Sequence, residues 1–194
     1  APDLWVEINI NNSNSNKFRI GVMGRDYIHK NLNSIIYVKK IIKEYYKIDI
    51  EFYVTLNEKE FSSKSKFFKA EVINLGPLKI NECADFYKKM DLIFFPSLLE
   101  TFSATIIETL FFKKPLICCN LEFNKAVCLD YAIYFEPDNN FDAAQKIYET
   151  IQNIKNPIFI SKLEEGSNYI INNYSSNRRT NNYLNILNDH IHDK

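Results

Sequence analysis

Two carboxylates spaced eight residues apart follow an apolar run that ends at Pro96. Glu100 lies in a predicted loop, and Glu108 lies about two helical turns further on, along a helix predicted to begin near residues 102–105. The free backbone amides at the start of such a helix point into the loop and form a ready anion site. The two carboxylates could then accept hydrogen bonds from the hydroxyl groups of a sugar or a ribose.

A purely structural role for Glu108 is also consistent with this spacing. The run Thr105-Ile106-Ile107-Glu108 fits a capping box, in which the Glu bonds back to the residue that caps the helix. In that alternative Glu108 stabilises the start of the helix and contacts no ligand. The spacing by itself leaves both roles open.

A second charged loop, Gly24-Arg25-Asp26-Tyr27-Ile28-His29-Lys30, follows the first predicted strand. Arg25 can bind a phosphate through two parallel hydrogen bonds, and Lys30 adds a second positive charge. The alternative is an exposed Arg and Lys, with a surface ion pair from Arg25 to Asp26 that contributes little stability. The loop is neither a G-x-G-x-x-G fingerprint nor a Walker loop, which argues against a simple dehydrogenase or ATPase.

Both loops follow short apolar runs that alternate with amphipathic segments. Strands are predicted at residues 18–23, 50–56, 71–75, 91–95, 115–119 and 132–135. Helices are predicted at residues 33–46, 81–90 with Asn81 as a cap, 105–112, 142–154, 161–173 and 177–191. Residues 57–69 are predicted to form a loop or a short helix, and residues 119–128 a loop.

Continuous apolar strands that alternate with helices predict an α/β fold, a Rossmann-like parallel sheet with helices on both faces. In such sheets the ligand lies beyond the carboxyl ends of the strands. That rule selects four loops as candidates for a ligand site: residues 24–30, 76–80, 96–104 and 119–128.

The composition excludes several classes of protein. The chain holds 24 basic and 24 acidic residues, so its net charge of zero gives no indication of nucleic-acid binding. Its most apolar stretch, residues 92–99, is too short to span a bilayer. The four cysteines form no C-x-x-C and no zinc-type spacing, so neither a zinc site nor a disulfide framework is predicted, and a cytoplasmic setting fits best.

The order and spacing of these motifs resemble the group 1 glycosyltransferases, also called glycosyltransferase family 4. Residues 87–117, Y-K-K-M-D-L-I-F-F-P-S-L-L-E-T-F-S-A-T-I-I-E-T-L-F-F-K-K-P-L-I, are similar to the family signature, in which a strand ending in Pro-Ser leads to Glu, seven residues and a second Glu. Further matches are the family's Gly-Arg-(four residues)-Lys loop at Gly24, Arg25 and Lys30, its Leu-Gly turn at Leu75 and Gly76, and its later segment at residues 132–137. The resemblance covers about residues 18–173.

The resemblance implies one half of a GT-B fold, in which two Rossmann-like domains face a cleft and the C-terminal domain binds the nucleotide sugar. Every matched motif is similar to that C-terminal half. Residues 1–17 are then expected to be a linker or a remnant of the interdomain connection, residues 18–175 the nucleotide-sugar-binding domain and residues 176–194 a C-terminal helix. The N-terminal half that binds the acceptor is expected to be missing.

The resemblance also implies a role for each matched residue. Arg25 and Lys30 would stabilise the departing diphosphate, whose negative charge needs compensation. Glu100 would contact the transferred sugar, and Glu108 would receive the ribose hydroxyls. The remaining implied contacts are Gly24 in the phosphate loop, Leu78, Lys79 and Ile80 around the base, and Thr101, Phe102, Ser103 and Ala104 near sugar and phosphate oxygens. No metal and no cofactor are expected, since the sequence contains no Asp-x-Asp.

The chain departs from the family pattern at four positions. Thr101 and Ser103 replace two glycines, and their added side chains narrow the predicted sugar pocket. Lys114 and Ala126 stand where Gly and Glu are usual. The charged set is intact, so a working site is expected.

The expected function is therefore donor binding in a retaining, metal-independent glycosyltransferase. Such an enzyme moves a sugar from a nucleotide diphosphate sugar to a sugar or lipid-linked acceptor. The full-length protein is expected at the cytoplasmic face of the inner membrane, in bacterial surface polysaccharide or lipopolysaccharide synthesis. Two alternatives stay open: a sugar-nucleotide epimerase of the same GT-B shape, and a non-catalytic module that binds a nucleotide sugar.

Overall fold

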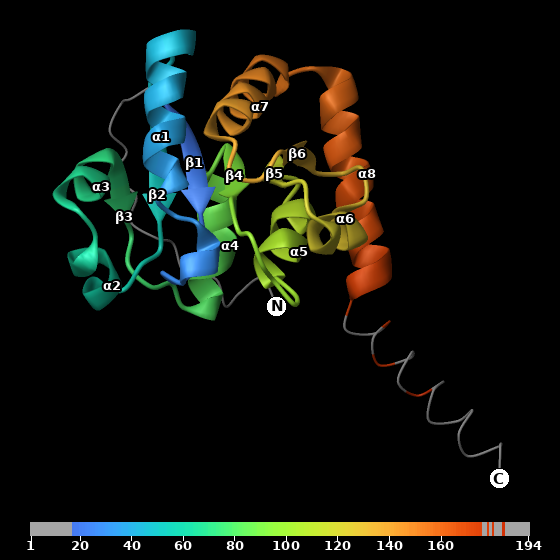
Figure 1. Cartoon of the computed structure of the whole chain (residues 1–194). Coiled ribbons are helices and arrows are strands. Elements are labelled where there is room, and N and C mark those ends of the chain that lie inside the picture. The colour runs from blue at the N-terminus through green and yellow to red at the C-terminus, as the bar shows by residue number, and fades with distance from the viewer. Residues whose placement is uncertain (1–16, 176–177, 179, 181–183, 185–194) are drawn as a thin grey trace.

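Six short apolar strands form a parallel sheet in the part of the chain that the structure, a computed structural model, describes: residues 17–175, 178, 180 and 184 (Figure 1). The strands are β1 (Phe18–Val22), β2 (Ile50–Val54), β3 (Val72–Asn74), β4 (Leu92–Phe95), β5 (Leu116–Cys119) and β6 (Ile133–Phe135). Each lies within the predicted range, and all neighbouring pairs are parallel. Their order across the sheet is β3-β2-β1-β4-β5-β6.

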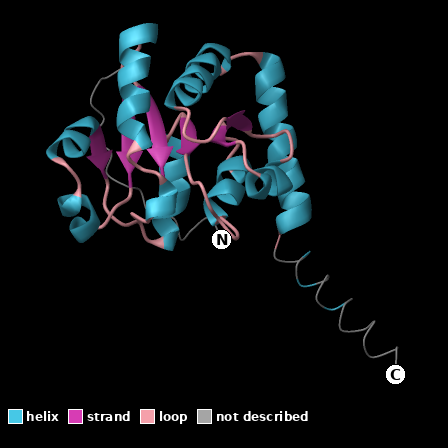
Figure 2. Cartoon of the chain, viewed as in Figure 1, coloured by secondary structure: helices cyan, strands magenta, loops and turns pink. Residues whose placement is uncertain are grey.

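Helices connect these strands and cover the sheet on both faces (Figure 2). They are α1 (Ser34–Ile41), which continues as the π-helical turn η3 (Ile42–Tyr46), α2 (Glu58–Ser63), α3 (Lys66–Glu71), α4 (Ile80–Lys89), α5 (Ala104–Phe111), α6 (Glu122–Cys128), α7 (Asn140–Asn153) and α8 (Pro157–Tyr174). A short 3-10 helix, η2 (Ile28–Lys30), ends the loop after β1. Within the described ranges, no helix combines the length and the apolar character needed to cross a membrane.

Alternate side chains of the strands enter two separate cores, as the pleat of a strand requires. Leu92 and Phe94 of β4 pack with α1, α3 and α7 on one face of the sheet. Ile93 and Phe95, the residues between and after them, pack with α4, α5, α6 and α8 on the other face. A strand buried on both faces has no polar alternation, which confirms the predicted Rossmann-like α/β fold.

Some local predictions are wrong. Helix α4 begins at Ile80, and the residue that caps it is Lys79 and not Asn81. The carboxylate of Glu82 accepts the Lys79 N–H at 2.6 Å and thereby satisfies the amide at the helix entry. Most of the loop predicted at residues 119–128 is α6, a seven-residue helix too short to show a clear apolar period.

The predictions for residues 57–69 and for the two ends of the chain compare with the structure as follows. Residues 57–69 form two short helices, α2 and α3, where a loop or a short helix was predicted. The predicted linker at residues 1–17, apart from Lys17, and most of the predicted helix at residues 177–191 lie outside the described residues. The domain boundaries therefore stay predictions.

The strand order places a reversal between β1 and β4. The chain builds outward from β1 to β3 and then returns to the other side of β1 to build β4, β5 and β6. In open parallel sheets, ligands bind beyond the carboxyl ends of the strands at such a reversal. The segments that follow β1 and β4 are the two charged loops, so the fold brings them to the expected place.

Candidate functional site

The two charged loops meet through Lys30 and Glu100. The Lys30 ammonium donates a hydrogen bond to Oε1 of Glu100, and the two side chains are only 15% and 11% exposed. The Ser97 hydroxyl donates to the same oxygen at 2.7 Å, and Lys30 Nζ lies 5.3 Å from the centre of the Phe95 ring. Water and salt screen a sheltered pair of this kind less than a surface pair. The structure therefore joins two of the three residues predicted to be catalytic.

Backbone contacts fix the same two loops against each other. Leu98 N–H donates to the carbonyl oxygen of His29 at 2.7 Å. The Ser97 hydroxyl lies 3.3 Å from that carbonyl oxygen as well. The His29 ring stacks on Tyr27, with 5.6 Å between the ring centres. These contacts set the position of Lys30, which directly follows His29.

Gly24 lies at the carboxyl end of β1, next to the stem of Lys30. Its φ of 150° is one that residues with a side chain rarely adopt. Its N–H donates to the Thr55 hydroxyl at 3.1 Å, which ties the loop to the end of β2. A Cβ at this position would lie 3.8 Å from Cε of Lys30, so the glycine and the lysine are neighbours.

Arg25 is paired with a residue that the sequence did not indicate. Its Nε donates to Oε1 of Glu60 in α2 at 2.7 Å, and its side chain is 54% exposed. Asp26, the partner in the alternative interpretation, forms its ion pair with Lys64 at 2.5 Å. The surface pair of that alternative, from Arg25 to Asp26, is therefore wrong, because residues after β2 supply the partners of both side chains. No contact of Arg25 with Lys30 or Glu100 is found in the described structure.

Glu108 is not part of a capping box. Helix α5 begins at Ala104 with Ser103 as its cap, so Thr105 is already the second helical residue. Oε2 of Glu108 instead accepts a hydrogen bond from the Tyr87 hydroxyl in α4 at 2.8 Å. The capping-box alternative is therefore wrong, since the helix starts too early for Thr105 to act as its cap.

The residues predicted to contact sugar and base lie at the starts of two helices. Thr101, Phe102, Ser103 and Ala104 lead into α5, whose first amides have no acceptor within the helix. Leu78, Lys79 and Ile80 lead into α4, and Ile80 is 93% exposed. The bond to Tyr87 shows that Glu108 faces α4, and burial and then the nearby charge of Glu108 raise the pKa of the Cys83 thiol in that helix. The roles of these residues stay predictions.

Four partners of the predicted site were missed in the sequence: Thr55, Glu60, Tyr87 and Ser97. Asn57 and Glu60 have the spacing of a capping box, which could have indicated the helix that carries Glu60. Ser97 lies within residues 87–117, which resemble the family signature, but the resemblance implied no role for it. No local pattern marks the hydroxyl of Tyr87 as the partner of a residue in another helix.

A metal site is not apparent among the described residues. No group of three or more His, Cys, Asp or Glu side chains lies in a position to hold an ion there. The four cysteines are free thiols, and Cys118, Cys119 and Cys128 are buried. The expectation that no metal is needed stays a prediction.

Comparisons with known proteins identify a family and several similar structures. The model of the family described as glycosyl transferases group 1 matches residues 4–176. A glycosyltransferase from Rickettsia africae ESF-5 superposes with a TM-score of 0.82 at 21% identity, covering 93% of this chain and 49% of that one. A mutant of S. aureus TarM, in complex with fondaparinux, alpha-GlcNAc-glycerol and UDP, superposes with a TM-score of 0.69 at 18% identity, covering 95% and 38%.

A shorter structure also matches. The catalytic domain of cholesterol-alpha-glucosyltransferase from Helicobacter pylori has a TM-score of 0.64 and 19% identity, and 80% of this chain covers 98% of that one. A search of curated proteins found no significant match. The likenesses confirm the fold, and this chain spans about half or less of the Rickettsia and TarM structures.

Proposed function

Because this chain belongs to the glycosyl transferases group 1 family, we propose that it binds the nucleotide diphosphate sugar donor of a retaining glycosyltransferase. The observation that carries the proposal is the contact between Lys30 and Glu100 where the strand order reverses. A sheltered cation, a carboxylate and the start of α5 lie on the two loops that meet there. That combination suits a ligand with both an anionic diphosphate and hydroxyl groups.

The chemistry assigned to the cations is stabilisation of the leaving diphosphate. Its negative charge grows as the bond to the sugar breaks, so fixed positive groups accelerate the reaction. An ammonium group has three donors, so Lys30 can keep its bond to Glu100 and still donate to a phosphate oxygen. Arg25 and the first amides of α5 complete the positive surroundings. In this proposal no metal ion is required.

The carboxylates are assigned to the hydroxyl groups of the donor. Glu100 uses Oε1 for Lys30 and Ser97, and Glu108 uses Oε2 for Tyr87. Within the described part of the chain no hydrogen bond reaches the second oxygen of either carboxylate, so that oxygen is assigned to the ligand. Glu100 lies in the loop that carries Lys30 and is assigned to the sugar, while Glu108 faces α4 and is assigned to the ribose.

The acceptor is assigned to residues outside this chain. The chain spans 49% of the Rickettsia structure and 38% of TarM, which supports a second half in the complete enzyme. We therefore expect no useful transfer of sugar by these 194 residues alone. For the complete enzyme the proposal includes a sugar or lipid-linked acceptor and surface polysaccharide synthesis at the cytoplasmic face of the membrane.

A thermal-shift panel tests the proposal. The chain is heated with UDP, GDP, ADP and their sugars, each with and without EDTA. A ligand that binds the native state raises the melting temperature by mass action. We expect a rise with at least one nucleoside diphosphate, unchanged in EDTA. A rise that disappears in EDTA would contradict the metal-free assignment, and no rise with any ligand would contradict donor binding.

A further inference from the structure

Glu60 is a carboxylate that the chain itself holds in place. Its N–H donates to Oδ1 of Asn57 at 2.8 Å, and the Asn57 N–H donates to its Oε2 at 3.0 Å, which completes a capping box at the start of α2. The Glu60 side chain is 16% exposed. Because the Asn57 N–H holds Oε2 of the carboxylate, no ligand is needed to order it.

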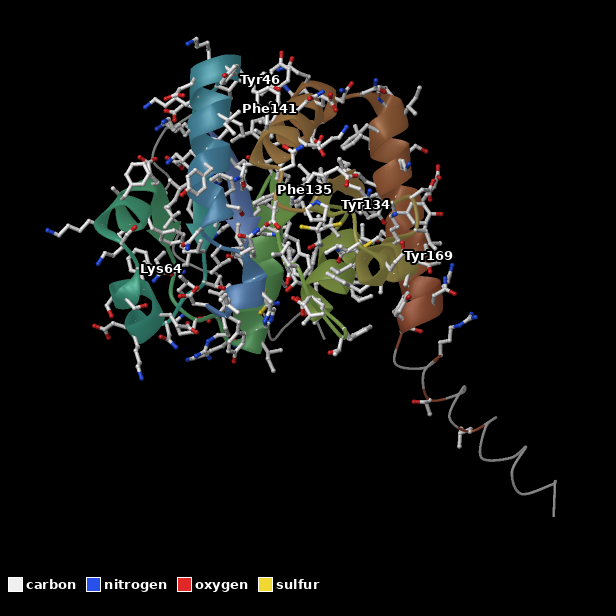
Figure 3. The ribbon with its side chains drawn as sticks, viewed as in Figure 1. Tyr46, Lys64, Tyr134, Phe135, Phe141 and Tyr169 are labelled. Carbon is white, nitrogen blue, oxygen red and sulfur yellow. The ribbon has the colours of Figure 1, made fainter. Side chains whose placement is uncertain are left out.

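The other oxygen of Glu60 faces the loop after β1. Oε1 accepts hydrogen bonds from Arg25 Nε at 2.7 Å and from the Asp26 N–H at 3.2 Å. Lys64, the residue after α2, holds the Asp26 carboxylate in an ion pair, and both side chains are mostly buried (Lys64 is labelled in Figure 3). Glu60 in α2 and Lys64 after it therefore bind this loop at two adjacent residues, Arg25 and Asp26.

These bonds also keep Glu60 ionised. Burial raises the pKa of the Glu60 carboxyl, but the hydrogen bonds from Arg25 and from the backbone of Asn57 and Asp26 outweigh burial and bring the pKa below its usual value. Arg25 thus meets a full negative charge at neutral pH. An acceptor that is charged and already ordered holds a flexible side chain better than an ordinary surface partner does.

The bond to Glu60 leaves the outer end of Arg25 available. A guanidinium carries five N–H donors, and Nε is the innermost of its three nitrogens. Glu60 takes Nε, and the terminal nitrogens have no hydrogen-bond partner among the residues whose contacts are described. Those two nitrogens can donate a bidentate pair of hydrogen bonds to phosphate oxygens. The Arg25 side chain is 54% exposed, so a ligand can reach it.

We propose that Glu60 is a positioning residue, which holds Arg25 by Nε and thereby presents the terminal nitrogens to the diphosphate. This inference rests on the proposed function, since it requires that Arg25 binds a phosphate. Glu60 itself touches no ligand. Holding the arginine before the ligand arrives reduces the conformational entropy that binding would otherwise remove.

A competing role for Glu60 makes the opposite prediction. If its negative charge mainly repels the diphosphate, or withholds Arg25 from it, neutralising Glu60 would tighten binding. If Glu60 positions Arg25, neutralising it weakens binding. The sign of the change therefore separates the two roles.

A double-mutant cycle measures that sign. Calorimetry follows the nucleoside diphosphate that binds best among UDP, GDP and ADP, using the natural chain, Glu60→Gln, Arg25→Ala and the double variant. Gln also serves in a capping box, so α2 is retained. We expect Glu60→Gln to weaken binding by roughly three- to tenfold with Arg25 present, and to change nothing with Arg25→Ala. Glu58→Gln, an exposed change on the same helix, is the matched control and is expected to be silent.

Each other outcome has a definite meaning. Tighter or unchanged binding by Glu60→Gln, or the same loss in both Arg25 backgrounds, overturns the positioning role and leaves the proposed function intact, provided that Arg25→Ala weakens binding. If Arg25→Ala is silent, the assigned role of Arg25 fails and the inference fails with it. If the natural chain binds none of the three nucleotides, the proposed function itself is contradicted.

Discussion

The hydroxyl of Tyr87 in α4 donates a 2.8 Å hydrogen bond to Oε2 of Glu108 in α5. The Tyr87 ring is fully buried and stacks on Phe112, with 5.4 Å between the ring centres. Burial, and then the charge of Glu108, raise the pKa of Tyr87 well above its ordinary value, so the phenol keeps its proton. Tyr87 thus fixes one oxygen of Glu108, and no hydrogen bond to the other is found among the described residues.

We expect Tyr87→Phe to weaken nucleoside diphosphate binding while the fold is retained. The change keeps the ring and its packing but removes the donor that orients Glu108. Loss of a hydrogen bond to a charged group is worth about 1.5–3 kcal/mol, which sets an upper limit of roughly a hundredfold on the loss of affinity. Calorimetry measures the affinity, and urea unfolding measures the stability.

Tyr53→Phe is the matched control for that experiment. The Tyr53 hydroxyl donates to Oε2 of Glu51 at 2.8 Å, so this change also removes a bond between a buried Tyr and a Glu. Glu51 lies near the start of β2, in register with Arg19, whereas the loops of the proposed site follow the carboxyl ends of β1 and β4. Equal losses of nucleotide affinity in Tyr53→Phe and Tyr87→Phe would show that the effect is general destabilisation.

A second prediction concerns the division of labour between the two carboxylates. Glu108→Gln is expected to weaken the binding of a nucleoside diphosphate and of its sugar alike, by roughly tenfold or more, because both ligands carry the ribose. Glu100→Gln is expected to weaken the binding of the sugar-bearing ligand only. Glu100→Gln also removes the negative charge beside Lys30. The positive charge of Lys30, which the diphosphate needs, stays in place.

Calorimetry of both variants against a nucleoside diphosphate and its sugar tests this division. Equal losses for both ligands in both variants would refute it. An unchanged affinity in both variants would remove Glu100 and Glu108 from the proposed site altogether.

The sequence predicts this fold well because its strands are buried on both faces. The run Leu92-Ile93-Phe94-Phe95 has no polar alternation, and it is the strand β4 that separates the two cores. Such runs between amphipathic helices leave few architectures open. The short helix α6 was missed since its seven residues give too little periodicity to detect.

The contacts of the site were much less predictable, because they join residues far apart in the chain. Lys30 and Glu100 are 70 positions apart, and Arg25 and Glu60 are 35 apart. Local spacing says nothing about such pairs. The family resemblance placed Lys30 and Glu100 in one site, but it gave no role to Glu60 or Tyr87, which depend on how α2 and α4 pack.

A third prediction concerns the close packing at Gly21 in β1. A Cβ there would lie 2.7 Å from Ile93 Cδ1, Met90 Cγ and Phe86 Cζ, closer than real Cβ contacts. Gly21→Ala is therefore expected to destabilise the fold by about 1–3 kcal/mol, measured as a lower urea midpoint with an unchanged slope. Strand propensity alone predicts that Gly21→Ala stabilises the fold, because glycine weakens a strand.

Ile93→Val supplies the check on that explanation. It removes Cδ1, one of the three atoms that the new Cβ would meet. In the Ile93→Val background, Gly21→Ala should destabilise less than it does in the natural chain. An equal loss in both backgrounds would point to a cause other than this contact.

The last prediction concerns the backbone at Leu129, which ends α6 with φ 49° and ψ −121°. The Tyr131 N–H donates to the carbonyl of Cys128 at 2.9 Å and closes a four-residue turn with Leu129 in its second position. These angles belong to a type II′ turn, in which glycine is preferred at that position. A side chain in such a sparsely populated region costs about 1–3 kcal/mol.

Comparing Leu129→Gly with Leu129→Ala isolates this strain, because both changes remove the same half-exposed side chain and only alanine keeps a Cβ. We expect the Gly variant to be more stable than the Ala variant by about 1–2 kcal/mol in urea unfolding, after the greater freedom of glycine in the unfolded chain is subtracted. Ala126→Gly, within α6 and exposed, provides the reverse comparison and should destabilise by about 0.5–1 kcal/mol. If alanine were the more stable residue at both positions, ordinary propensity would explain the data and the turn at Leu129 would not be strained.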